Sequence, residues 1–203
     1  MSTPRSCKTD LFVAGAWIDP AQVQVIFADF QGNLPDSSRT RSPEALARSA
    51  VGLAKIAKLL DIPMLFTSAA QDGMDPTTME ALKPWSHDGN TYYRMTSGTF
   101  MDEKAAAAID ANDRPILLVA GFASEVVVMQ TVLDGLAAGY RVYYVVDAIG
   151  SQTNRSEQAV FREIEQAGAI PTSVISLATR LAPDLSTSPG KEVLAIMLDT
   201  VTD

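Results

Sequence analysis

The residues best placed to do chemistry stand directly after two apolar runs of the chain. Asp29 follows the run 23–28, and a carboxyl group in such a position can act as a general acid or base. The segment 121–125, which reads Gly-Phe-Ala-Ser-Glu, follows another apolar run and begins a helix. The first N–H groups of a helix can hold an anion or an oxyanion. If the two runs are neighbouring strands, Asp29 faces this helix start across a cleft.

Other kinds of catalytic site lack the residues that they need. Ser124 is expected to cap the helix, because no histidine lies at a spacing that would make it a nucleophile. The single histidine, His87, lies in a polar turn, and Asp72 and Asp75 alone do not make a zinc site. Neither a G-x-G-x-x-G nor a Walker sequence occurs. We therefore expect no metal and no cofactor.

Short apolar runs alternate with amphipathic stretches along the chain. The runs are rich in Val, Ile and Leu rather than alternating with polar residues, which is typical of buried parallel strands. They lie at 23–28, 63–68, 115–120, 141–146 and 171–176, with a weaker candidate at Tyr92 and Tyr93. Strands that alternate with helices over short connections predict an α/β fold. The expected architecture is a three-layer α/β/α sandwich around a doubly wound, mostly parallel sheet of about six strands.

The helices are predicted from their caps and their apolar faces. Ser42-Pro43 begins a helix that ends before Pro63, and Asp75-Pro76 begins a short one. Further helices are expected at 102–111, 124–138, 154–168 and 189–201, the third of these opened by a capping box at 154–157. We take 1–203 as one domain, in which 1–20 is an N-terminal extension and 189–201 is the C-terminal helix.

The composition excludes several classes of partner. Of the 203 residues 47% are hydrophobic, so one domain can bury a large core without disulfides or metals. The net charge of −8 repels nucleic acids and anionic lipids. No apolar stretch approaches the ~20 residues of a membrane span, and the run 11–18 is too short for a signal peptide. A single cysteine, Cys7, fits a reducing compartment, so a cytoplasmic location is predicted.

Several motifs occur in a fixed order along most of the chain. Asp29-Phe30-Gln31 matches an Asp-x-Gln that follows the first strand, and 121–128 matches the pattern Gly-Val-x-Thr-x-x-Cys-Val. Further motifs of the same pattern are matched by the segments 67–69, 94–102, 137–148 and 166–169. Through these motifs the sequence resembles the isochorismatase-like hydrolases and, among them, the YcaC-like cysteine hydrolases.

The resemblance implies roles for three positions. In the cysteine members an aspartate is a general acid or base, a basic residue stabilises charge, and a cysteine attacks the substrate. Asp29 and Arg94 match the first two positions, whereas Val127 stands at the third. Valine cannot attack a carbon, and the loss of a nucleophile costs on the order of 10⁶ in turnover. Covalent amidase chemistry at position 127 is therefore excluded.

Some relatives with this fold lack the cysteine and hydrolyse a vinyl ether by acid catalysis. In this chain Asp29 would be the acid, and burial among apolar neighbours would raise its pKa. Arg94 would oppose that rise, and a tight pair would keep Asp29 ionised and favour anion anchoring. Arg94 could equally be a surface residue that pairs with Asp88 or Asp102. The sequence leaves these alternatives open.

The resulting hypothesis is a hydrolase-family protein that acts on or binds a small, anionic molecule without a cysteine nucleophile. Asp29 is its general acid or base and Arg94 anchors the anion. The expected substrate-binding residues are Gln31, Phe122, Ser124 and Val126. The alternative is a catalytically inactive relative that serves as a small-molecule binder or an assembly subunit. The resemblance also implies a homo-oligomer, a dimer or larger, and gives no reason to expect nucleic-acid or membrane partners.

Overall fold

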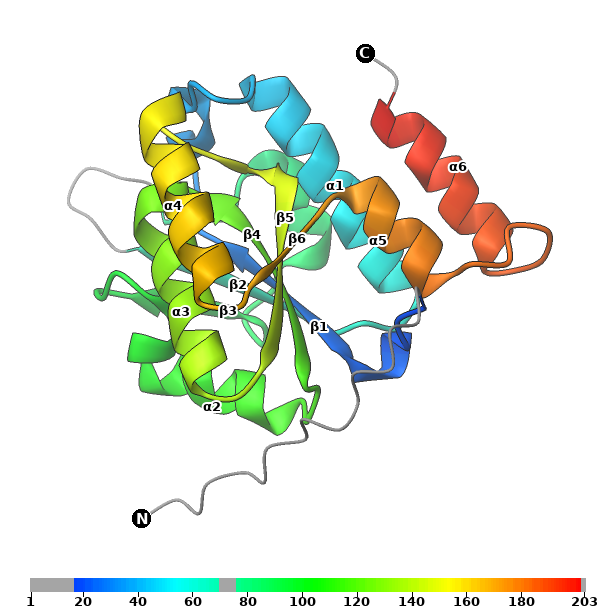
Figure 1. The fold of residues 1–203 in the computed structure, drawn as a ribbon, viewed down its shortest axis with the longest axis horizontal. Helices are drawn as coiled ribbons and strands as arrows, with labels where there is room; N and C mark the ends of the chain where they lie inside the picture. The colour runs from blue at the N-terminus through cyan, green and yellow to red at the C-terminus, as the bar shows by residue number, and fades with distance from the viewer. Residues whose placement is uncertain (1–16, 70–75, 202–203) are drawn as a thin grey trace.

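The centre of the fold is one parallel sheet (Figure 1). The computed structural model describes residues 17–69 and 76–201, and within them six strands pair in the order β3-β2-β1-β4-β5-β6, each pair parallel. The strands are β1 (Val23–Ala28), β2 (Met64–Ala69), β3 (Thr91–Arg94), β4 (Ile116–Phe122), β5 (Arg141–Gly150) and β6 (Ile170–Thr172). The chain winds outward from β1 to β3 and then returns beside β1 as β4, so the strand order reverses between β1 and β4. The prediction of a doubly wound α/β fold is confirmed.

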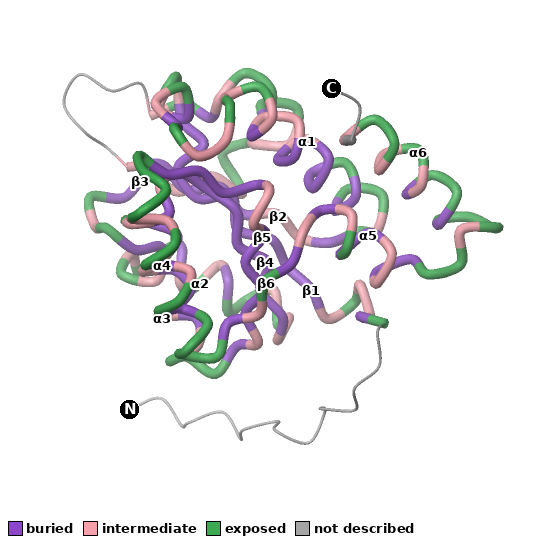
Figure 2. The backbone as a smooth tube through the Cα atoms, turned by 45° about the horizontal axis from the view of Figure 1, so that its top comes forward, coloured by how far each residue is buried: buried purple, intermediate pink, exposed green. Residues whose placement is uncertain are grey.

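Helices cover both faces of this sheet, as Figure 1 shows. They are α1 (Pro43–Leu59), α2 (Glu103–Ala111), α3 (Met129–Ala137), α4 (Asn154–Gln166), α5 (Val174–Leu181) and α6 (Gly190–Val201). One hydrophobic cluster joins the sheet to α1, α5 and α6, and a second joins its other face to α2, α3 and α4. In Figure 2 the strands are largely buried, whereas the helices keep one exposed side. This is the expected three-layer arrangement.

Capping side chains begin several of these helices. Ser42 Oγ accepts a hydrogen bond from the backbone N–H of Ala45 at 3.2 Å, as the sequence predicts for α1. The capping box predicted at 154–157 is wrong, because Thr153 is the N-cap of α4 and its hydroxyl accepts the N–H of Ser156 at 3.0 Å. The helix predicted to begin at Asp75-Pro76 starts outside the described residues; a short 3-10 turn follows it at Glu80–Trp85.

The apolar run 171–176 is a strand only in its first half. β6 ends at Thr172, and α5 begins two residues later. Ser173 caps α5 by accepting the N–H of Ser176 at 3.2 Å, and the apolar side chains that follow recur with helical spacing. The sequence prediction missed this helix because a short apolar run has no period that separates a strand from the start of a buried helix.

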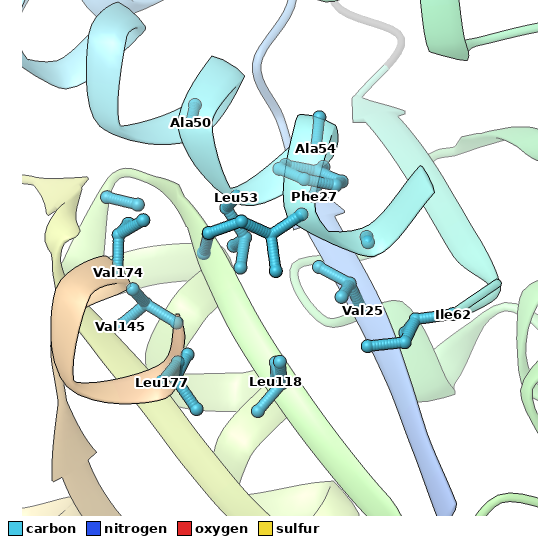
Figure 3. Packing of buried hydrophobic residues seen from close by; sticks show 14 of the residues in the cluster. Val25, Phe27, Ala50, Leu53, Ala54, Ile62, Leu118, Val145, Val174 and Leu177 are labelled. Atoms are coloured by element: carbon cyan, nitrogen blue, oxygen red, sulfur yellow. The ribbon is translucent and has the colours of Figure 1, made fainter. Parts of the chain in front are cut away.

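Buried aromatic and aliphatic side chains pack behind the end of β1. Phe27 stacks on Phe66 of β2 with ring centroids 4.9 Å apart. Figure 3 shows Leu53 of α1 near Phe27 and Leu118 of β4, all of them buried. Buried side chains in such a core are held in single rotamers, so the end of β1 is rigid. Asp29 follows β1 directly and is therefore held in a fixed position.

Candidate active site

The carboxyl ends of β1 and β4 lie side by side, as the sequence hypothesis required. Ala28 pairs with Gly121 in the sheet. A Cβ atom on residue 121 would lie 2.9 Å from the Cβ of Ala28, so only glycine allows the two strands to come this close. Asp29 therefore follows β1 beside the point where β4 leads into the helix start of the segment 121–125.

Asp29 is held in an unusual backbone conformation at the end of β1. Its φ of 57° lies in the left-handed region, which is uncommon for residues other than glycine. The backbone N–H of Asp29 donates to the carbonyl of Thr67 at 2.9 Å, and the Thr67 hydroxyl donates to Asp29 Oδ1 at 3.3 Å. Backbone strain of this kind collects at functional sites, where the surrounding structure holds it in place.

Arg94 is the direct partner of Asp29. It is the last residue of β3, two strands away from β1, and its Nη2 donates to Asp29 Oδ2. A second nitrogen, Nη1, donates to the carbonyl of Thr96. Arg94 is only 2% exposed, so it is not the surface residue that one alternative supposed, and Asp102 instead caps α2.

Burial and the ion pair act in opposite directions on the acidity of Asp29. Burial raises the pKa of the Asp29 carboxyl above its ordinary value, while the Arg94 guanidinium and the Thr67 hydroxyl lower it. Burial is the largest of these effects, so the pKa stays above the ordinary value. The group is thus easier to protonate than a solvent-exposed aspartate.

A cavity of about 400 Å³ opens over this ion pair. Asp29 and Arg94 line it, together with residues from the ends of β2, β3 and β4 and from the loops beside them. The other lining residues are Leu34, Ala69, Met95, Thr96, Ser97, Phe122, Ala123, Glu125, Val126 and Gln152. A space of this volume accommodates a small organic molecule.

The cavity brings together some of the residues expected at the site. Asp29, Arg94, Phe122 and Val126 line it, and Val126 is 49% exposed. Val127 is fully buried in the hydrophobic cluster on the α2–α4 side of the sheet. Cys7, Asp72 and Asp75 and most of the predicted N-terminal extension lie outside the described residues.

Ser124 does not cap the helix, contrary to the expectation from sequence. The residue with extended backbone before the helix is Ala123, and η6, a wide turn of π type over Ser124–Val128, leads into α3. The Ser124 hydroxyl donates instead to Glu125 Oε2 at 2.9 Å. Ser124 is fully buried, so its side chain serves the neighbouring carboxylate rather than the cavity directly.

Gln31 is buried beside the cavity and holds the end of β2. Its Nε2 donates to the carbonyl of Ala69 at 2.8 Å, and its Oε1 accepts the backbone N–H of Ala69 at 2.6 Å. The side chain thus pairs with Ala69 as a neighbouring strand would. Ala69 lines the cavity, so Gln31 shapes the cavity wall by fixing this residue.

Replacing Gln31 by Met, which has a similar shape, is expected to lower the free energy of unfolding by about 1–3 kcal/mol, because both polar backbone atoms of Ala69 lose a partner. Chemical denaturation measures the change. The matched control is Gln166→Met on the exposed end of α4, where a change within about 0.5 kcal/mol is expected. An equally small change for Gln31→Met would show that the pairing with Ala69 does not stabilise the fold.

Glu125 is a cavity residue that sequence reasoning missed. Its Oε2 accepts hydrogen bonds from the hydroxyls of Ser124 and Ser151, and Oε1 accepts the backbone N–H of Gln152 at 3.2 Å. Partial burial by itself would raise the pKa of the Glu125 carboxyl, but these hydrogen bonds together hold it below its ordinary value. The signal in the sequence was an acidic residue in the first turn of a helix that follows a strand end.

The fold is that of a known family. The isochorismatase domain model matches residues 23–176, and the chain belongs to the isochorismatase family. It is 30% identical over 140 residues to the "Secreted isochorismatase effector Isc1" of Phytophthora sojae. The matched region covers 68% of this chain and 67% of that protein.

Solved structures of YcaC proteins have the same fold. YcaC from Pseudomonas aeruginosa, described "with hexane-2,5-diol and covalent acrylamide", superposes with a TM-score of 0.83 at 25% identity, covering 91% of this chain and 92% of that one. YcaC from Escherichia coli, described as "an octameric hydrolase of unknown specificity", gives a TM-score of 0.85 at 22% identity, covering 91% of each chain. The protein is therefore a hydrolase-like member of the isochorismatase family with YcaC-like structural neighbours.

The described residues contain neither a cluster of metal ligands nor a helix that could cross a membrane. Within 17–69 and 76–201, no three histidine, cysteine or acidic side chains are grouped as metal ligands would be. In the same part of the chain, every helix is too short or too polar to cross a membrane.

Proposed function

We propose that this protein hydrolyses a small molecule in the cavity over Asp29, without forming a covalent intermediate. The observation that carries the proposal is a buried, strained aspartate with a raised pKa that lines a cavity at the switch point of the sheet. Perturbed carboxyl groups in clefts are characteristic of catalytic acids and bases.

In this mechanism Asp29 is the general acid. It gives its proton to the substrate, and a water oxygen bonds to the electrophilic carbon as the bond to the leaving group breaks. The proton that the water loses returns to Asp29, so the carboxyl group is regenerated.

Arg94 would set the reactivity of Asp29. The guanidinium orients the carboxyl group through the Nη2–Oδ2 contact and is itself oriented by the carbonyl of Thr96. When Asp29 carries a proton, the positive charge of Arg94 is left without its carboxylate, and it can then balance negative charge on the substrate. This is the form in which Arg94 could act as the anion anchor expected from the sequence.

Position 127 would correspond to the nucleophile of the cysteine hydrolases. In Val127→Cys, built on a Cys7→Ser background to remove the only other thiol, we expect acrylamide to add to the new cysteine, but more slowly than to an exposed thiol, because side chain 127 is buried. The covalent acrylamide named for YcaC of Pseudomonas aeruginosa motivates this probe. Intact-protein mass spectrometry measures the adduct, and the Cys7→Ser protein is the control. If the thiol introduced at position 127 stays unmodified under conditions that label free cysteine, the correspondence is contradicted.

A catalytically inactive binder or assembly subunit is the second candidate. The ion pair in which Arg94 donates to Asp29 favours it, because an ionised Asp29 carries no proton to give to a substrate. The octameric state of YcaC from Escherichia coli supports a homo-oligomer, which sedimentation measures. A cytoplasmic location also remains a prediction.

The test of the proposed function is a hydrolysis assay on isochorismate and a panel of small amides. We expect turnover of at least one of these compounds by the wild-type protein. A ligand that raises the melting temperature but is never converted would favour the binder instead. If none of the compounds is converted or bound, the role as an assembly subunit is favoured.

A further inference from the structure

Three ionisable side chains among the described residues line the cavity: Asp29, Arg94 and Glu125. Asp29 and Arg94 form an ion pair, so their charges cancel when both are ionised. The hydrogen-bond donors of Glu125 among the described residues are two hydroxyls and a backbone N–H, which are all neutral. They do not cancel its negative charge as Arg94 cancels that of Asp29. While Asp29 is ionised, the remaining charge of the ionisable groups in the cavity is therefore the negative charge of Glu125.

The surroundings of Glu125 are built to keep this carboxylate charged. Ser124 and Ser151 are both fully buried, and their hydroxyls donate to Oε2 at 2.9 and 2.7 Å. The backbone N–H of Gln152 donates to Oε1 at 3.2 Å. Donors of this kind stabilise the ionised carboxylate and make it a poor acceptor of a further proton. Glu125 is thus better suited to hold a fixed negative charge than to act as a catalytic base.

A second carboxyl group, that of Glu157, interacts with Glu125 but does not line the cavity. Burial raises the pKa of the Glu157 carboxyl, and the charge of Glu125 raises it further, which shows that the two acidic groups interact. The Arg41 guanidinium opposes the rise in pKa at Glu157 and at Asp147. The donors that hold Glu125 are hydroxyls and an amide, so its own negative charge is not balanced by them.

Much of the remaining cavity lining is apolar. Leu34, Phe122, Met95 and Val126 contribute carbon-rich surface to it. The cavity therefore offers one fixed carboxylate and an apolar wall. Such a site is complementary to a molecule with an apolar body and one positively charged nitrogen group.

We propose that Glu125 selects a small organic cation as the ligand of this cavity and binds its ammonium group. An anionic ligand would instead meet the Glu125 carboxylate in a space of about 400 Å³, while Arg94 donates to Asp29 and to Thr96. The inference rests on the proposed function only in that it assigns a ligand class to the same cavity, in the state with the Asp29–Arg94 ion pair formed. It reverses the sign of charge that the sequence analysis expected for the ligand.

The experiment compares three probes with the same apolar body, butylammonium, butyramide and butyrate, by calorimetric titration of the full chain at neutral pH. We expect wild-type protein to bind butylammonium more tightly than butyramide, and butyrate most weakly. In Glu125→Gln the affinity for butylammonium should fall by about tenfold to a hundredfold, because a charge-assisted hydrogen bond is lost. The affinity for butyramide should change little.

Two control variants separate a local effect from other causes. Glu163→Gln, on the exposed surface of α4, removes the same charge away from the cavity and should leave all three affinities unchanged. Glu125→Asp keeps the charge and should retain the preference for butylammonium, even if Glu125→Gln fails to fold. Tighter binding of butyrate than of butylammonium to the wild type, or no measurable binding of butylammonium, would overturn the proposal. These probes need no turnover, so the result is independent of whether Asp29 is catalytic.

Discussion

Asp29→Asn is expected to lower turnover by about 10²–10⁴-fold, because asparagine cannot deliver the proton that a general acid supplies. The amide oxygen can still accept the hydrogen bond from Arg94, and the amide NH2 can donate to the Thr67 hydroxyl, so the fold should be retained. Steady-state kinetics on any substrate found in the panel measures the loss, and circular dichroism checks the fold. Asp88→Asn, in an exposed turn, is the matched control and should keep full activity.

The pH dependence of the wild-type rate follows from the same role. A general acid works only while it carries its proton, so the rate should fall as pH rises through the pKa of Asp29. Burial raises this pKa, which moves the falling limb of the profile to higher pH than for an ordinary aspartate. A rate that instead rises with pH over this range would mean that Asp29 acts as a base.

Arg94→Met is expected to lower the free energy of unfolding by about 3–5 kcal/mol at neutral pH, because it leaves a buried carboxylate without its partner. Both side chains are almost completely buried, with 1% of Arg94 and 7% of Asp29 exposed, so water cannot replace the guanidinium. Chemical denaturation measures the change. The double variant Arg94→Met/Asp29→Asn should recover part of the loss, since no unpaired charge then remains.

The stability loss in Arg94→Met should itself depend on pH. Removing the guanidinium lets the pKa of Asp29 rise further above its unfolded value, because the effect that lowers it is gone. When the pKa of Asp29 is higher in the folded state than in the unfolded state, the stability is greatest at pH values below the pKa of the unfolded state. It is lost as the pH rises through the pKa of the folded state. The deficit should therefore shrink as pH falls. A deficit that is equal at acidic and neutral pH would argue against an unpaired Asp29 carboxylate as its cause.

The sheet could be predicted from the sequence because most of its strands are short runs rich in Val, Ile and Leu that alternate with amphipathic stretches. That β1 and β4 are neighbours was only a condition of the site hypothesis, and the sheet fulfils this condition. The start of α5 could not be predicted, because Thr172 and Val174 belong to one short apolar run with no visible period. The change from strand to helix there is decided by the cap at Ser173 and by packing against β5.

The site was predictable only in part. Asp29 was found from its place after β1, and Arg94 from its place in a family motif. Their direct contact spans three strands, and no sequence spacing encodes it. Glu125 was missed because its importance comes from Ser151, which lies 26 positions away in the chain. Glu125 lies on the wide turn η6, and the backbone geometry of this turn determines that it lines the cavity. Local helix propensity does not predict such a turn.

The central claim is that hydrolysis in this cavity proceeds through Asp29 without an intermediate bonded to the protein. The most direct test is intact-protein mass spectrometry on samples quenched in acid during steady-state turnover, with product formation followed in the same samples. The account predicts that product accumulates while the mass of the chain stays unchanged. A mass increase equal to a substrate fragment, formed and lost at the rate of turnover, would contradict it.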